Sequence, residues 1–332
     1  MAFEDSPNKK AVRSHWDLPI LERWRTVAGR QLTYFGLTGP RMLDLLAWKH
    51  LLDRRRDAVE ELPTSKAKRD AADDAAAALQ SAAMRYGLAD GLEILRGDIG
   101  TIITEGLDAY GARPQMSDGA ADRSRFFYDL HNLDFDGGLA FIEKKTGSAP
   151  RMDAIKKLFE RQRGHSFVLL LTVNVRNTVG KEIQDFLDRL AAQPSGGLID
   201  WYRVRCGGEV EHRLKAIVPL VVRAAAQPNG FRCLCHPPIA YTGYKSARMI
   251  HFCFELYAED KVFAGVSVQQ ESDVLTMPML EAQDGLMDFT LLQHPDCDLE
   301  AFAASISFLR SEHASGRLAA ALTAVGQQKQ EA

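Results

Sequence analysis

The chain has 332 residues, of which 46% are hydrophobic and 26% are charged, a balance that fits one large α/β domain with additions. Its formal net charge of −3 excludes a global positive field that would recruit nucleic acid, so any basic contact surface must be local. No apolar run approaches the length of a membrane span, and the amino terminus lacks the apolar core of a secretory signal. We therefore expect a cytoplasmic protein, whose oligomeric state the sequence does not indicate.

The cysteines indicate neither a disulfide framework nor a metal site. The chain has five cysteines and no Cys-x-x-Cys pair. Cys233 and Cys235 precede His236, but a single residue separates the two cysteines within an expected strand, and no second pair of ligands follows. Because closed zinc sites need such pairs, we expect no bound metal.

The first expected elements are a helix over residues 15–29 and a brief strand over residues 32–35. A glycine loop follows, and Pro40 then opens a helix that runs to residue 52, because proline suits a first helical turn. The glycines leave room for a ligand at the positive end of that helix, although the loop lacks the GxGxxG spacing of dinucleotide binders. The loop is either a ligand loop or a tight turn. Its residues are Gly36, Thr38 and Gly39.

The second expected strand, within residues 54–62, ends in two acidic residues, Glu60 and Glu61. Glu60 is the better candidate for a site because it directly follows apolar residues of the strand. An acidic residue at that position contacts ribose hydroxyls in α/β nucleoside binders. An alanine-rich helix over residues 66–87 then leads into the third strand.

The third strand and its turn occupy residues 91–103, a short apolar strand followed by Gly97, Asp98 and an apolar helix start. Gly97 allows a close turn of the backbone, and Asp98 projects from the carboxyl edge of the sheet, where open α/β sheets bind ligands. Asp98 either accepts hydrogen bonds from a nucleoside or caps the helix that begins near Ile99. Both interpretations remain open at the level of sequence.

The fourth expected strand spans residues 126–130, and a cluster of polar residues follows it. Burying so many polar groups without partners is costly, so the cluster is either a surface turn or a site. We favour a site, because a fourth parallel strand would direct these residues to the same edge as Asp98. The members are His131, Asn132, Asp134 and Asp136.

The remaining pattern completes one mostly parallel sheet. We expect an apolar central strand over residues 167–173 and, after it, an antiparallel hairpin joined by residues 237–247. The connection carries Tyr241, Tyr244 and Lys245, and it forms either a base-stacking surface or a rim loop. The predicted fold class is α/β: a Rossmann-like, doubly wound, seven-stranded sheet with an antiparallel last strand and a carboxy-terminal α+β extension. Further elements are expected at residues 150–163, 181–192, 211–226, 262–270, 284–292 and 299–325.

This order of segments resembles the class I S-adenosylmethionine-dependent methyltransferases. The likeness covers residues 31–259, so residues 1–30 form a helical lead-in and residues 260–332 an extension packed on the same domain. The resemblance implies S-adenosyl-L-methionine as cofactor, with the methionine moiety near the glycine loop, the ribose near Glu60 and the adenine near Asp98. The implied cofactor-binding residues are Phe35, Gly36, Thr38, Gly39, Glu60, Gly97, Asp98 and Ile99. The family's acidic residue on the first strand is replaced here by Thr33 and Tyr34.

The catalytic motif of the family would fall on residues 132–135, with Asn132, Asp134 and Phe135 as the catalytic candidates. The segment is loosely similar to the motifs of nucleic-acid amino-methyltransferases and tRNA guanine-N2 methyltransferases. Asn132 and Asp134 would hold an exocyclic amine, while Phe135 would stack on a base brought out of its helix. The resemblance thus implies N-methylation of a nucleobase in RNA or DNA. The alternatives are methylation of a small molecule or protein, or a non-catalytic partner module.

Overall fold

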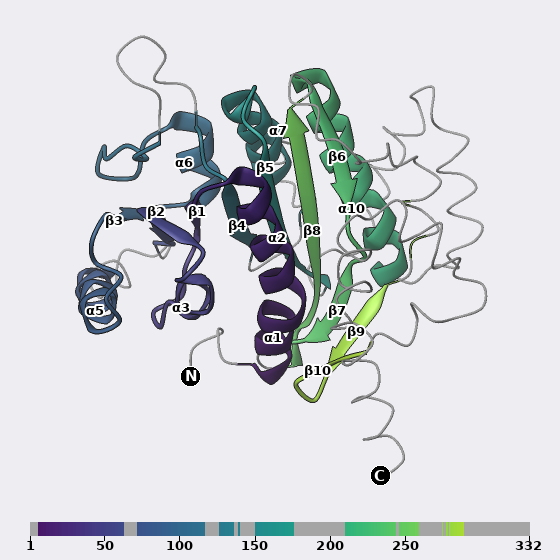
Figure 1. The fold of residues 1–332 in the computed structure, drawn as a ribbon, viewed down its shortest axis with the longest axis horizontal. Helices are drawn as coiled ribbons and strands as arrows, with labels where there is room; N and C mark the ends of the chain where they lie inside the picture. Colours follow the sequence, from purple (N-terminus) through teal and green to yellow (C-terminus); the bar gives the residue numbers. More distant parts are fainter. Residues whose placement is uncertain are drawn as a thin grey trace.

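The computed structural model describes a chain organised around a single sheet (Figure 1). The predicted elements at residues 181–192, 262–270 and 299–325 lie outside the described residues, as do Asp136, Tyr244 and Lys245. The described residues are 6–62, 72–116, 126–135, 139, 150–175, 210–243, 246–258, 274, 277 and 279–288.

Five parallel strands form one side of the sheet, with β3 at its edge. Their spatial order is β3, β2, β1, β4, β5, so the chain runs outward from β1 to β3 and then returns to the other side of β1 with β4. This reversal between β1 and β4 is a topological switch point, where ligands of open α/β sheets bind at the carboxyl ends of the strands. The bounds are β1 Leu32–Leu37, β2 Leu52–Glu60, β3 Leu92–Arg96, β4 Leu130–Asp134 and β5 Phe167–Asn174.

Antiparallel pairing begins beyond β5. Strand β8 (Arg248–Ala258) pairs antiparallel with β5, and its other edge is shared by β6 (Phe231–Cys235) and β7 (Ile239–Thr242). Strand β9 (Leu280–Gln283) lies parallel to β7, and β10 (Leu286–Asp288) pairs with β9. The mostly parallel, Rossmann-like sheet and its antiparallel hairpin confirm the predicted fold class. Residues from the expected carboxy-terminal extension lengthen the same sheet.

Helices cover both faces of the sheet, as doubly wound folds require (Figure 1). One face carries the amino-terminal helices together with α3 and α5, which cover one apolar cluster. The other face carries α6, α7 and α10, which cover a second apolar cluster. In the described ranges, no helix combines the length and apolar character needed to cross a membrane. The bounds are α1 Pro7–Val12, the π-helical η1 Arg13–Asp17, α2 Leu18–Ala28, α3 Leu43–Trp48, α5 Ala72–Arg85, α6 Ile99–Glu105, α7 Pro150–Gln162 and α10 Val210–Ala226.

Two predicted helix starts are wrong. The first helical segment begins at Pro7 instead of residue 15, because Ser6 caps it by accepting a hydrogen bond from the backbone N–H of Lys9 at 3.1 Å. Pro40 does not open α3, which begins at Leu43 after Met42 adopts a left-handed conformation with φ of 51°. Local sequence signals placed both helices but did not fix their first residues.

Two strand predictions are also corrected. The fourth strand spans Leu130–Asp134 and not residues 126–130, so Asn132 lies inside the strand between β1 and β5. Phe126 and Tyr128, which precede it, are buried by packing without belonging to the strand. The connection that we expected between the last two strands contains β7, which places the Tyr241 side chain in a buried position. Both corrections follow from tertiary packing overriding local pattern.

His131 makes the stability of the core depend on pH. Its side chain is fully buried, its Nε2 atom lies 2.6 Å from Nε2 of Gln162, and burial lowers its pKa from 6.5 to about 3. The folded protein therefore keeps this imidazole neutral while the unfolded chain protonates it, so stability falls as the pH drops below 6.5 toward 3. We expect His131 to contribute up to about 1.4 kcal/mol per pH unit to this slope.

Replacing His131 with phenylalanine should flatten the slope between pH 6 and pH 4, measured by urea unfolding at each pH. Gln162 keeps two hydrogen bonds to the backbone of Tyr128 in that variant, one as donor at 2.6 Å and one as acceptor at 3.3 Å. An unchanged slope would show that His131 does not titrate in this way.

Candidate functional site

A cavity of about 410 Å³ lies at the carboxyl edge of the parallel strands. Its walls come from the ends of β1, β2, β4 and β5, and it is closed by α1 and by the turn between β7 and β8. The volume is in the range of small-molecule and cofactor sites, and the position is the switch point of the sheet. Four of the residues predicted from sequence line it: Thr38, Gly39, Glu60 and Asp134.

Glu60 lies on the β2 side of the cavity. Its Oε2 atom accepts a hydrogen bond from Nε of Arg96 at 3.1 Å, and its backbone oxygen accepts one from the N–H of Gly97 at 3.0 Å. These contacts hold the end of β2 against β3 and fix the direction of the Glu60 carboxylate. A carboxylate fixed at this edge can accept hydrogen bonds from the hydroxyl groups of a bound ribose.

Asp44 lines the cavity, and Asn132 is bonded to it but lies outside the lining. Asn132 Nδ2 donates to Asp44 Oδ2 at 3.1 Å, and Nε of Arg13 donates to Asp44 Oδ1 at 2.5 Å. Burial raises the pKa of Asp44, but the charges of Arg13 and Lys9 lower it more, so the carboxyl pKa stays below its usual 3.8. Asp44 is thus ionised. It supplies a carboxylate beside β1, the strand on which the family's acidic residue is missing.

Lys9 and Asp134 form an ion pair on the β4 side of the cavity. Both residues line the cavity, and Lys9 Nζ donates to Asp134 Oδ2. Burial lowers the pKa of Lys9, but Asp134 and Asp44 raise it more, leaving it above its ordinary value. The ammonium group is therefore permanently charged.

The amino-terminal segment contributes side chains that the sequence analysis missed. Lys9, Arg13 and Asp17 recur every four residues and pair with Asp134, Asp44 and His251, the last with 2.8 Å between Asp17 Oδ1 and His251 Nε2. Their spacing places them on one helical face. This spacing is a signal in the sequence, but the residues that pair with it are distant along the chain.

The other predicted site residues lie outside the cavity lining. Phe35, Ile99 and Phe135 are buried in the apolar cluster under α6 and α7, and the Phe135 ring lies 5.1 Å from the guanidinium carbon of Arg151. The structure therefore separates Phe135, on one face of the sheet, from Asp134, which faces the amino-terminal helix.

Gly36, Gly97 and Asp98 have structural contacts of their own. Gly36 lies within β1, packed against the backbone of Asn132 in β4. Gly97 has a φ of 152°, which favours glycine at the turn after β3. Asp98 caps α6 through Oδ1, which accepts hydrogen bonds from the N–H of Thr101 at 2.7 Å and from its hydroxyl at 3.0 Å. Contact of Asp98 with an adenine stays a prediction.

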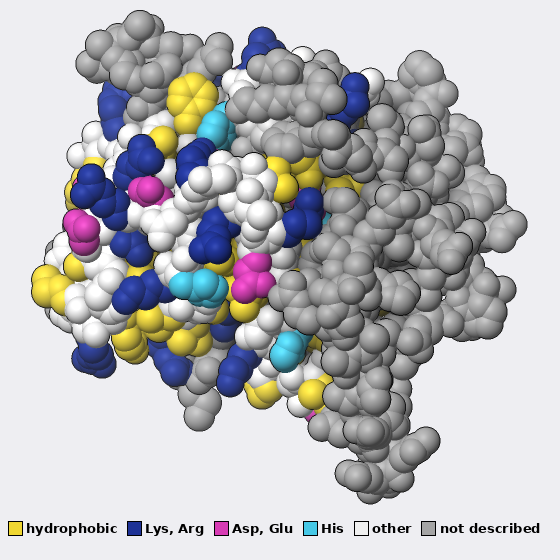
Figure 2. Space-filling view, viewed as in Figure 1, with side chains coloured by type: hydrophobic (Ala, Val, Ile, Leu, Met, Phe, Trp, Pro, Cys, Tyr) yellow, Lys and Arg dark blue, Asp and Glu magenta, His cyan; other side chains and the backbone are white. Residues whose placement is uncertain are grey.

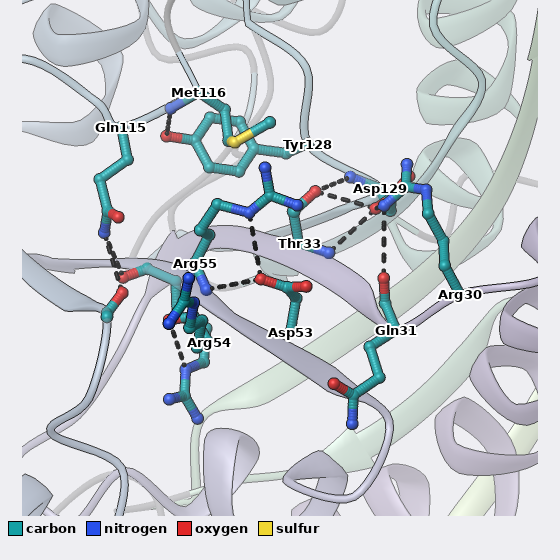
Figure 3. A network of polar contacts seen from close by, with 12 residues as sticks. Arg30, Gln31, Thr33, Asp53, Arg54, Arg55, Gln115, Met116, Tyr128 and Asp129 are labelled. Atoms are coloured by element: carbon teal, nitrogen blue, oxygen red, sulfur yellow. Dashed lines mark hydrogen bonds and ion pairs between the residues drawn. The ribbon is translucent and has the colours of Figure 1, made fainter.

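The opposite, amino-terminal edge of the sheet holds a polar network that explains Thr33 (Figure 3). Asp129 Oδ2 accepts from the Thr33 N–H and hydroxyl, each at 2.9 Å, and the Arg30 guanidinium donates to both carboxylate oxygens at 2.6 Å. Thr33 therefore ties β1 to the residue before β4. Its role lies at this edge and not at the cavity.

Comparison with known proteins gives only distant structural likenesses. No protein-family model and no curated protein sequence matches the chain. The O-methyltransferase TomG from Streptomyces achromogenes, in complex with SAM, is 15% identical with a TM-score of 0.34, over 76% of this chain and 90% of that one. An O-methyltransferase from Bacillus cereus, in complex with SAH, is 12% identical with a TM-score of 0.37, over 76% and 91%.

A third likeness is to the methyltransferase domain of a bacterial Hen1 protein, 10% identical with a TM-score of 0.30, over 71% of this chain and 99% of that domain. All three neighbours are methyltransferases.

Proposed function

We propose that this chain is an S-adenosylmethionine-dependent methyltransferase. The observation that carries the proposal is the cavity at the β1–β4 switch point, which collects Thr38, Gly39, Glu60 and Asp134 from three strand ends. These are residues that the family resemblance assigns to the cofactor and to the catalytic motif. Their convergence supports a pocket for a nucleoside-containing ligand.

The charges of the cavity fit this cofactor. Four of its lining side chains are carboxylates (Asp44, Glu60, Glu61 and Asp134), and one is an ammonium group. S-adenosylmethionine supplies an electrophilic methyl group on a sulfonium and also carries an ammonium group, so an acidic cavity favours it electrostatically. Glu60 would accept hydrogen bonds from the ribose, while Asp44 and Asp134 lie on the opposite side of β1.

We further propose a nucleobase nitrogen of RNA or DNA as the methyl acceptor. Asp134 lines the cavity and can accept a hydrogen bond from an exocyclic amine. Lys10 and Arg41 are exposed and adjoin the cavity-lining residues Lys9 and Pro40. Figure 2 shows further Lys and Arg side chains on the described part of the face that carries α1 and α2. Such residues would form a local surface for phosphate groups.

The burial of Phe135 favours a rival acceptor, a small molecule, because this ring is not available to stack on a base. Methyl transfer from labelled cofactor onto RNA, DNA and small-molecule fractions distinguishes the two. Labelling of nucleic acid that weakens steeply with added salt supports the first acceptor. Labelling of the small-molecule fraction alone supports the second.

Binding of the demethylated product, S-adenosylhomocysteine, tests the cofactor assignment by isothermal titration calorimetry. Glu60→Gln should weaken binding about tenfold, because a charged acceptor of ribose hydroxyl groups contributes about 1.5 kcal/mol. Glu93→Gln is a matched control, since Glu93 is an exposed carboxylate on the neighbouring strand β3. Absence of binding to the unmodified protein at millimolar ligand would refute the proposal, and equal affinities of the two variants would remove the role of Glu60.

A further inference from the structure

Lys9 is the one cationic side chain among the described residues that line the cavity. Its side chain is 16% exposed and that of Asp134 is 24% exposed, whereas the deeper Arg13 is only 5% exposed. A ligand in the cavity can therefore reach Lys9 and Asp134 directly. Arg13 is buried and does not line the cavity.

The strand order gives the cavity two ends. Glu60 comes from β2, on one side of β1, and Asp134 comes from β4, on the other side. If the ribose lies at Glu60, as the proposed function holds, the amino-acid end of the cofactor points toward β4. Lys9 and Asp134 face that end.

We infer that Lys9 binds the carboxylate of the cofactor's amino-acid end and, in doing so, leaves Asp134. This inference rests on the proposed function and deepens it. The Lys9–Asp134 ion pair then occupies both groups in the ligand-free site, with Asp134 competing against the cofactor for the ammonium group. Once Lys9 moves to the ligand, the Asp134 carboxylate is released to accept a hydrogen bond from the methyl acceptor.

The chemistry of the two groups supports this exchange. Lys9 remains protonated, and an ammonium group has three donors for carboxylate oxygens. The other carboxylates around it repel the ligand's carboxylate, so that group has no alternative cation among the described lining residues. The cofactor should consequently bind before the acceptor, because Asp134 is occupied until Lys9 leaves it.

A pair of ligands that differ only by the carboxylate tests the inference: S-adenosylmethionine and decarboxylated S-adenosylmethionine. Lys9→Met should weaken binding of the first about ten- to a hundredfold and leave binding of the second within about twofold, in line with the strength of charged hydrogen bonds. Asp134→Asn should strengthen binding of S-adenosylmethionine, because it removes the competitor for Lys9. Calorimetric titration measures the dissociation constants of both ligands for the unmodified protein and for Lys9→Met, and that of S-adenosylmethionine for Asp134→Asn.

Three controls keep the outcomes separate. Lys156→Met removes an exposed ammonium group on α7, outside the cavity lining, and should change neither affinity. Lys9→Arg keeps the charge and should preserve the preference for the carboxylate-bearing ligand. Thermal unfolding without ligand checks that each variant is folded.

Equal weakening of both ligands by Lys9→Met would overturn the inference, because it would assign Lys9 a structural role. Weaker binding of S-adenosylmethionine to Asp134→Asn would overturn the competition between Asp134 and the ligand. If the unmodified protein binds neither ligand, the proposed function itself fails and the inference fails with it. Binding of both ligands without any effect of Lys9 overturns the inference alone.

Discussion

Replacing Asp44 with alanine should lower the free energy of unfolding by about 3–5 kcal/mol. The side chains of Arg13 and Asp44 are only 5% and 10% exposed, so the substitution removes a carboxylate that faces a buried guanidinium group. It also removes the acceptor for Asn132 Nδ2. The loss should loosen the packing of the Arg13 segment against α3 beside the cavity and weaken binding of the proposed cofactor.

Chemical unfolding of a small set of variants measures this effect. The double replacement of Arg13 with Met and Asp44 with Leu should recover much of the loss, because apolar side chains can replace a buried ion pair at little cost. Glu93→Ala, at an exposed carboxylate, is the matched control and should change stability by less than about 0.5 kcal/mol. If Asp44→Ala lowers the free energy of unfolding by less than about 1 kcal/mol, the Arg13–Asp44 ion pair does not stabilise the fold as proposed.

The effect of Asp44 should also depend on pH. Its folded-state pKa lies below 3.8, so its stabilising contribution is present above pH 4 and is lost as the pH falls through the folded-state pKa. The difference in stability between the unmodified protein and Asp44→Ala should therefore shrink in acid. A difference that grows on acidification would have the wrong sign for an ionised Asp44.

Gly36→Ala should destabilise the protein by about 3 kcal/mol, the upper end of the range for overpacked cores. A Cβ atom at this position would lie 2.4 Å from the backbone oxygen of Asn132 and 2.9 Å from its Cβ atom. Neither can yield easily, because β1 is hydrogen-bonded between β2 and β4 at this point. The substitution should weaken cofactor binding only through the displaced strands.

Gly243→Ala is a matched control that also lies at the cavity. The added Cβ atom there would meet a flexible side-chain atom, Cγ of Met249, at 3.3 Å. Thermal and urea unfolding of the two variants should differ by most of the predicted 3 kcal/mol. Equal stabilities would show that the Gly36 strand can shift, and the glycine would then be better explained by ligand contact.

Much of the fold follows from local pattern. The apolar run of residues 167–173 predicted a central parallel strand, and the structure places β5 there with every residue buried. The alternation of strands and helices predicted the direction of the sheet, since parallel strands need crossover connections. The prediction began β4 four residues too early, at residue 126 instead of Leu130. Aromatic residues that are buried outside a strand cannot be told by composition from aromatic residues within one.

The candidate site was predicted in part. Glu60 and Asp134 could be found because acidic residues at strand ends of a doubly wound sheet meet at one edge. Phe135 could not be placed, because the face on which a side chain lies depends on strand register, and a shift of one residue reverses it. For Asp98, the cap of α6 and the edge of the sheet coincide, so the sequence alone could not separate the two roles.

The sequence by itself determined the class of fold and the edge of the sheet at which the cavity lies, because both follow from the local periodicity of apolar residues and the places where it breaks. Only the tertiary structure decided that the amino-terminal helix completes the cavity. Lys9 and Asp134 are 125 residues apart in the chain, and Asp17 and His251 are 234 apart. Pairing at such separations depends on the assembled sheet, since no short-range signal specifies which distant charge a side chain will face.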